Sequence, residues 1–202
     1  MTAATATFRE QGHEYQVEGI PIPSVTQVLT LAGIDDVSKI PFHNLERARV
    51  IGTAVHEACQ FLDEEDLLLA SLDPEITGYV LAYQKFRLEH GFEPEKIECR
   101  KIAMLDGMKY GMCVDRVGTV DGMESIVLDI KTASRPSPAW AIQTAAYAAG
   151  LSSISDYRRM VVHLAKDGKY KLIAHNDEAD LAVFHAALKV AHWRMNHGVK
   201  LR

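Results

Sequence analysis

One apolar run of the sequence carries two charged residues: residues 126–132 read Ile-Val-Leu-Asp-Ile-Lys-Thr. In a β-strand, side chains two residues apart point to the same face, so we expect Asp129 and Lys131 to lie side by side. Burying such charges is costly unless they pair with each other or bind a metal ion. The segment therefore predicts either a structural ion pair or a chemical site, and these residues alone favour the ion pair.

A further carboxylate, Asp115, belongs to another strand-like run, in the sequence Gly-Met-Cys-Val-Asp-Arg at residues 111–116. On an antiparallel neighbouring strand, Asp115 would lie near Asp129, and two such carboxylates repel unless they share a cation or a proton. Oxygen-rich sites of this kind select Mg²⁺ or Mn²⁺. Beside such a metal, Lys131 could activate a water or neutralise charge on phosphorus. Taken alone, Asp115 and Arg116 favour the other interpretation, solvated strand residues near a turn.

Three more polar residues come from helix-like segments. His56 lies in Gly-Thr-Ala-Val-His-Glu at residues 52–57, and the chain has nine histidines, most of which we expect to be packed or exposed without a role. Gln143 and Tyr147 are four residues apart, so they share one helical face and offer hydrogen-bonding groups. In their alanine-rich segment they fit the polar edge of a core helix just as well.

Capping patterns predict the helices that position these residues. Ser24 and Gln27 form a capping-box pattern, which predicts a short helix that ends near residue 33. Pro41 predicts the first turn of a longer helix, up to residue 62, that carries His56. Gly52 in its interior costs about 1 kcal/mol relative to alanine, which indicates the close approach of a chain segment or a ligand. Asp73 and the proline after it predict the next helix, up to residue 91.

The hydrophobic period then changes to that of strands. Asp-Gly pairs at 106–107 and 121–122 predict tight turns, so the first three strands form an antiparallel meander. The expected strands are 96–104, 109–120, 125–132, 157–165 and 169–175, after an N-terminal hairpin at 7–17 that turns at Gln11 and Gly12. Helices are expected at 138–150 and 177–197. The fold class is therefore α/β, with a central mixed β-sheet flanked by helices.

Length and composition favour one ordinary globular domain. The 202 residues are 48% hydrophobic and 24% charged, and we expect residues 1–40 and the helix at 177–197 to pack on a core of about 41–175. A net charge of −5 means that nucleic acid would need a local basic patch or bound cations. Three widely spaced cysteines argue against disulfides and zinc knuckles and fit a reducing cytoplasm. Neither a membrane span nor a signal peptide is expected.

The combination and order of the polar motifs are more specific than any one of them. Gly-Thr-x-x-His on a helix, Gly-x-x-x-Asp-Arg and Asp-Ile-Lys-Thr on successive strands, and Gln-x-x-x-Tyr on the next helix resemble the RecB-like branch of the PD-(D/E)XK nuclease superfamily. The branch includes helicase-associated nuclease domains, CRISPR adaptation exonucleases and phage recombination exonucleases. The resemblance covers about residues 50–150, and Pro-Ser-Val-Thr at 23–26 is similar to stand-alone phage-type members. It implies a restriction-endonuclease-like core.

The resemblance also implies roles for single residues. His56, Asp115, Asp129 and the backbone carbonyl of Ile130 would be metal ligands, and Lys131 would be the catalytic lysine. Glu98 is an outer-shell carboxylate in this scheme. The residues expected to contact DNA or brace the site are Gln143, Tyr147, Thr132, Arg49 and Arg135.

The implied function is an Mg²⁺- or Mn²⁺-dependent DNA exonuclease of phage-type recombination, replication or repair, in a bacterial or phage-infected cytoplasm. DNA is the expected partner, with a recombination or single-strand-annealing protein as a second. No iron–sulfur cluster is expected, because the chain has only three cysteines. A structure-selective endonuclease or resolvase, a non-catalytic DNA-binding module and a plain α/β protein with an ion pair stay open.

Overall fold

A five-stranded mixed sheet forms the centre of the computed structural model, which describes residues 6–9, 14–36, 40–122 and 124–201. The strand order is β4-β5-β6-β7-β8, and every neighbouring pair is antiparallel except β6 and β7, which are parallel. The predicted α/β class with an antiparallel meander is confirmed. The strands are β4 (Phe92–Leu105), β5 (Met108–Val120), β6 (Glu124–Lys131), β7 (Arg158–Leu164) and β8 (Tyr170–His175).

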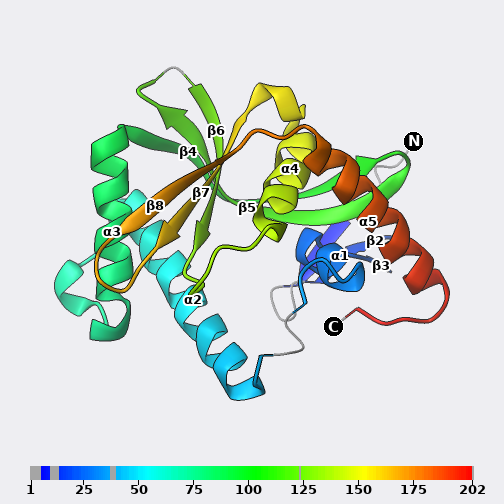
Figure 1. Cartoon of the computed structure of the whole chain (residues 1–202), viewed down its shortest axis with the longest axis horizontal. Helices are drawn as coiled ribbons and strands as arrows, with labels where there is room; N and C mark the ends of the chain where they lie inside the picture. Colours follow the sequence, from blue (N-terminus) through cyan, green and yellow to red (C-terminus); the bar gives the residue numbers. More distant parts are fainter. Residues whose placement is uncertain (1–5, 10–13, 37–39, 123, 202) are drawn as a thin grey trace.

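Helices cover both faces of this sheet (Figure 1). One face packs on α2 (Phe42–Asp63) and α3 (Pro74–His90), and the other on α4 (Ala139–Leu151) and α5 (Ala179–Asn196), of which α5 packs on both α4 and β5. Ile126 and Leu128 belong to the hydrophobic core on the α2 and α3 side of the sheet, and Val127 belongs to the core on the α4 side. Both faces of β6 are therefore apolar and buried, which explains its continuous hydrophobic run.

A small antiparallel sheet precedes the core. It consists of β1 (Ala6–Arg9), β2 (Glu14–Val17) and β3 (Ile20–Ile22), while the predicted turn at Gln11 and Gly12 lies outside the described residues. Its Tyr15 packs directly on β5 at Gly111, where an added Cβ would lie 2.1 Å from the tyrosine ring. Gly111 also donates a backbone hydrogen bond to the carbonyl of Pro23 at 2.9 Å. These contacts hold the N-terminal segment, with α1 (Val25–Leu31), against the core.

Local signals located most element boundaries. Ser24 and Gln27 form the predicted capping box at α1, and Asp73 accepts a hydrogen bond from Glu75 at the start of α3. Both Asp-Gly pairs occupy turns with positive φ, as tight hairpins require. The short 3₁₀ helices are η1 (Leu69–Ser71) and η2 (Ile154–Asp156).

The start of β4 differs from the prediction. The strand begins at Phe92, four residues earlier than expected, and a register shift between Pro94 and Lys96 interrupts its pairing with β5. A proline and a bulge in this edge strand disturb the alternation of polar and apolar residues, so the sequence pattern hid the first part of the strand. In the described ranges, no helix has the length and apolar character needed to cross a membrane.

Candidate metal centre

Three neighbouring strands each place one carboxylate at the same level of the sheet. Glu98 of β4 lies opposite Asp115 of β5, because the residues on either side of them pair in register. Pairing between β5 and β6 ends at Arg116 opposite Leu128, so Asp115 and Asp129 come next, where the two strands separate. The sheet thus brings together Glu98, Asp115 and Asp129.

The side chains of Asp115 and His56 bind the backbone of Ile130 at this point. The Oδ2 atom of Asp115 accepts a hydrogen bond from the Ile130 amide at 2.7 Å, and His56 Nε2 donates one to the Ile130 carbonyl at 2.9 Å. The Nδ1 atom of His56 lies 3.6 Å from Asp115 Oδ2. Both backbone polar groups of Ile130 are therefore occupied by side chains, which holds Asp115 and His56 in defined positions.

The ligand atoms of His56, Glu98 and Asp115 all lie within 4.8 Å of one another, as a metal site requires. Glu98 has a φ of +48°, a left-handed conformation that is costly for a residue other than glycine. Its Oε2 atom accepts a hydrogen bond from the Cys113 thiol at 3.2 Å. The sequence indicated Glu98 as an outer-shell residue, whereas the structure groups its carboxylate with His56 and Asp115.

Asp129 is fully buried, and its hydrogen bonding is incomplete. Its Oδ2 atom lies 2.7 Å from the Lys131 ammonium, while Oδ1 has no hydrogen-bond partner among the residues that the structure describes. Burial raises the pKa of Asp129 to about 6, against the opposing effect of Lys131. A cation would compensate the buried oxygen atom, and the carboxylates and the imidazole of this group are side chains that ligate metal ions.

Among His56, Glu98, Asp115, Asp129 and Lys131, the lysine is the residue whose side chain is positively charged throughout the physiological pH range. Burial alone would lower the pKa of Lys131, but Asp129 and Asp115 outweigh burial and raise it. The side chain therefore stays an ammonium, which can donate hydrogen bonds to an anion.

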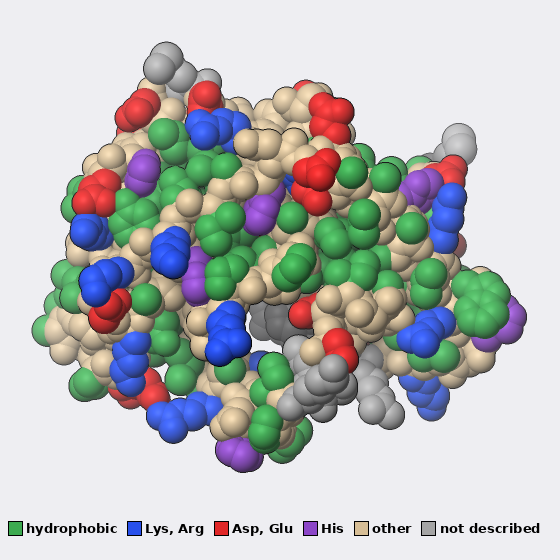
Figure 2. All heavy atoms as spheres, in the orientation of Figure 1, with side chains coloured by type: hydrophobic (Ala, Val, Ile, Leu, Met, Phe, Trp, Pro, Cys, Tyr) green, Lys and Arg blue, Asp and Glu red, His purple; other side chains and the backbone are tan. Residues whose placement is uncertain are grey.

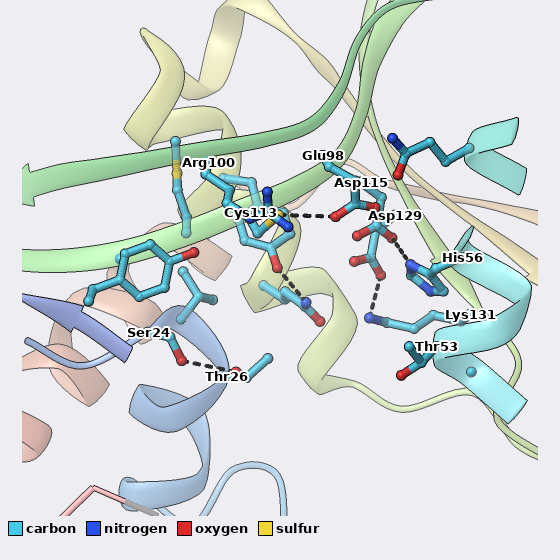
Figure 3. Close-up of a pocket in the computed structure, with 18 of the residues that line it drawn as sticks. Ser24, Thr26, Thr53, His56, Glu98, Arg100, Cys113, Asp115, Asp129 and Lys131 are labelled. Carbon is cyan, nitrogen blue, oxygen red and sulfur yellow. Dashed lines mark hydrogen bonds and ion pairs between the residues drawn. The ribbon is translucent and has the colours of Figure 1, made fainter. Parts of the chain in front are cut away.

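The cluster lies at one end of a pocket of about 600 Å³. Figure 3 shows Asp115, Asp129 and His56 on one side, while Ser24 and Thr26 lie at the opposite end. Gly52 forms part of the wall, where an added Cβ would meet only Thr132 Oγ1, at an ordinary 3.5 Å. The chain itself therefore does not require glycine there, and the pocket leaves room for a ligand.

Gln143 and Tyr147 line the same pocket from α4. Gln143 Nε2 donates a hydrogen bond to the Tyr147 hydroxyl at 2.7 Å, and both side chains are buried. Burial, followed by the charge of Asp129, raises the pKa of Tyr147 well above its usual value. This arrangement is consistent with a role of the pair in holding the site in place, one of the two roles expected for Gln143 and Tyr147.

The other three residues expected to contact DNA or brace the site, Arg49, Thr132 and Arg135, are not among those that line the pocket. Arg49 is exposed and pairs with Glu46 at 3.0 Å, Arg135 is exposed in the loop after β6, and Thr132 is half-buried. Arg100, which lines the pocket, was not selected from the sequence. Arg100 lies two residues after Glu98 on the same strand, and side chains two residues apart share a face. This spacing could have predicted that Arg100 points to the same side as Glu98.

Comparison with known proteins supports the fold. The sequence matches no protein-family model and no curated protein. A crystal structure described as a "Putative exonuclease" from Eubacterium rectale is similar, with a TM-score of 0.55 and 13% identity over 89% of this chain and 83% of that chain. The structure of SSO0001 matches with a TM-score of 0.41 and 17% identity over 75% of this chain and 76% of that chain. The chain thus has a five-stranded mixed sheet flanked by helices in common with the Eubacterium rectale protein.

Proposed function

We propose that this chain is an Mg²⁺- or Mn²⁺-dependent DNA nuclease, and more specifically an exonuclease that hydrolyses phosphodiester bonds. The observation that carries the proposal is Asp129, a fully buried carboxylate beside Lys131 and the ligand group of His56, Glu98 and Asp115. One of its oxygen atoms has no hydrogen-bond partner in the described part of the chain. A buried charge of this kind is costly without a cation. The fold likeness to a protein described as a "Putative exonuclease" supports the reaction class.

The metal would be held by a subset of His56, Glu98, Asp115, Asp129 and the Ile130 carbonyl, because Mg²⁺ takes one or two carboxylates and keeps several waters. When bound, it polarises a phosphoryl oxygen and makes a coordinated water more acidic. The contacts of Asp115 and His56 with Ile130 orient these ligands before any metal arrives. Such preorganisation reduces the free-energy cost of assembling the site.

Lys131 acts on the substrate in this proposal. Its ammonium is kept charged and is held at 2.7 Å from Asp129, beside the site where a phosphate would bind. There it donates hydrogen bonds to the phosphoryl oxygens and neutralises the negative charge that grows on them in the transition state. Gln143 and Tyr147 keep the floor of the pocket in place.

The polar and basic residues in and near the pocket support a nucleic-acid strand as substrate. Hydroxyl groups of Ser24 and Thr26 line the end of the pocket away from Asp115 and Asp129, and Arg100 lines it beside Cys113. Hydroxyl and guanidinium groups contact phosphate oxygens in nucleic-acid complexes. Exposed Lys166, Lys169 and Lys171 lie on the β7–β8 hairpin, and Figure 2 shows positive side chains over this part of the molecule. We propose phage-type recombination, replication or repair as the setting, with a single-strand-annealing protein as a candidate partner.

A cleavage assay with linear and circular DNA tests the proposal. Wild type should degrade linear DNA with Mg²⁺ or Mn²⁺ and not with EDTA, and Lys131→Ala should lose this activity. Lys85→Ala is a matched control, because Lys85 is an exposed lysine on the far helix α3. Cleavage of circles would favour the endonuclease alternative. Wild type that is inert with both metals on linear, circular and single-stranded DNA would contradict the catalytic proposal.

A further inference from the structure

Next to the candidate metal centre, Arg116 and Asp63 form an ion pair in which both side chains are completely buried. The Nε–H of Arg116 donates a hydrogen bond to Asp63 Oδ2. Two residues of α3 add to the pair: the Tyr83 hydroxyl donates to Asp63 at 3.0 Å, and Arg87 lies 3.1 Å from the same carboxylate. The result is a small buried network of charged and polar groups between the sheet, α2 and α3.

This ion pair joins the two elements that carry His56 and Asp115. Asp63 is the last residue of α2 and follows His56 by seven residues, which is about two helical turns, so both side chains lie on one face of the helix. Arg116 directly follows Asp115 on β5. The distance between α2 and β5 at the metal centre is therefore set by a contact that lies immediately behind it.

Arg116 also reaches the third strand of the site. Its Nη1 atom donates a hydrogen bond to the backbone carbonyl of Asp115 at 2.6 Å and another to Glu98 Oε1 at 3.4 Å. One planar guanidinium thus contacts α2, β5 and β4 at the same time, a geometry that the point charge of a lysine cannot reproduce.

Stability alone does not account for this network. Replacing a buried ion pair with apolar residues of similar volume is often neutral or stabilising, because the charges lose their hydration. Here Arg116 Nη2 is buried and has no hydrogen-bond partner within the described part of the chain, so the pair is incompletely compensated. A cost of this kind is consistent with a role in fixing geometry.

We infer that Asp63 and Arg116 are positioning residues that hold His56, Glu98 and Asp115 in the arrangement that binds the metal. This inference rests on the proposed metal centre. It states that the ion pair increases the affinity for the metal and does not contribute mainly to the stability of the fold.

The test replaces the three fully buried members of the network with apolar groups, in the variant Asp63→Leu/Tyr83→Phe/Arg116→Met, and leaves Arg87, whose side chain is 25% exposed. Urea unfolding in EDTA measures stability, and calorimetry measures Mn²⁺ affinity without any activity assay. We expect stability equal to or above that of wild type, and Mn²⁺ binding weaker by about 10- to 100-fold, the range typical for groups that orient metal ligands. A matched control is Arg159→Met/Asp180→Leu, which removes another ion pair, 2.9 Å long, between the buried Arg159 of β7 and the partly buried Asp180 of α5. The control should bind Mn²⁺ like wild type.

Each outcome is decisive. A folded triple variant that binds Mn²⁺ as tightly as wild type overturns the positioning role but leaves the metal centre intact. Wild type that does not bind Mn²⁺ overturns the metal centre itself, and the positioning role with it. Should the triple variant not fold, Arg116→Lys decides, because it keeps the charge and removes the planar fork. We expect Arg116→Lys to fold and to bind Mn²⁺ more weakly, and wild-type affinity in this variant contradicts the inference.

Discussion

His56 donates a hydrogen bond to the carbonyl oxygen of Ile130 at 2.9 Å, although 74 residues separate them in the sequence. The amide of Ile130 donates in turn to Asp115. A helix and a strand therefore meet at the point where β5 and β6 stop pairing, and their side chains replace the missing partners of the sheet. The open end of a strand pair is what makes room for a site here.

The first prediction concerns the link between Asp115 and the metal. Mn²⁺ should raise the melting temperature of wild type, because a ligand that binds only the folded state stabilises that state. At an Mn²⁺ concentration one hundred times its Kd, the free energy of unfolding should rise by about 2.7 kcal/mol. Asp115→Asn should abolish the rise while keeping an acceptor for the Ile130 amide. Thermal melts with Mn²⁺ and with EDTA measure this, and Asp167→Asn in an exposed turn is the control. An unchanged shift in Asp115→Asn would remove Asp115 from the ligand set.

The second prediction separates the backbone of Glu98 from its carboxylate. Glu98→Gln and Glu98→Gly should both weaken Mn²⁺ binding, because both remove the charge. Only glycine also relieves the left-handed conformation at φ +48°, which costs about 1 kcal/mol or more. In EDTA, Glu98→Gly should therefore unfold at a higher urea concentration than Glu98→Gln. Equal midpoints would show that the conformation is not strained.

The third prediction compares two glycines inside helices. Gly52→Ala should stabilise the protein by about 1 kcal/mol, the usual gain for a helix interior, because the new Cβ makes only an ordinary contact. Gly78→Ala should destabilise it instead, since its Cβ would lie 1.8 Å from the carbonyl oxygen of Lys166. Urea unfolding measures both. We also expect Gly52→Ala to slow DNA cleavage, because the methyl group enters the pocket wall.

The fourth prediction concerns pH and His175. Burial, and then the positive charge of Arg159, lower the pKa of His175 below its usual 6.5, while Asp180 partly opposes them. The folded state therefore binds fewer protons than the unfolded state, so this contribution to stability is complete above about pH 6.5 and is lost as the pH falls below it. Urea unfolding from pH 8 to pH 5 should show a smaller loss for His175→Gln than for wild type. Identical pH profiles would contradict the assignment.

Local chemistry in the sequence determined the elements. The capping box of Ser24 and Gln27, the Asp73 cap and the two Asp-Gly turns depend on hydrogen bonds and φ angles within a few residues, so each can be read from neighbouring letters. The turns imply the meander, and the meander brings Asp115 to Asp129. The apolar run around Asp129 likewise predicted a buried strand, and the structure buries both of its faces.

Only the tertiary structure decided which side chains meet. Glu98 joins His56 and Asp115 because the pairing of β4 with β5 and a left-handed backbone turn it there, and no local pattern encodes that combination. Arg49 lies near the motifs in sequence, yet its helix carries it out to solvent. Arg116 looked like an ordinary strand charge, but α2 and α3 close over it completely. The elements follow from short-range hydrogen bonding, whereas the site depends on contacts between segments far apart in the chain, whose burial and pairing exist only once the sheet and helices have packed.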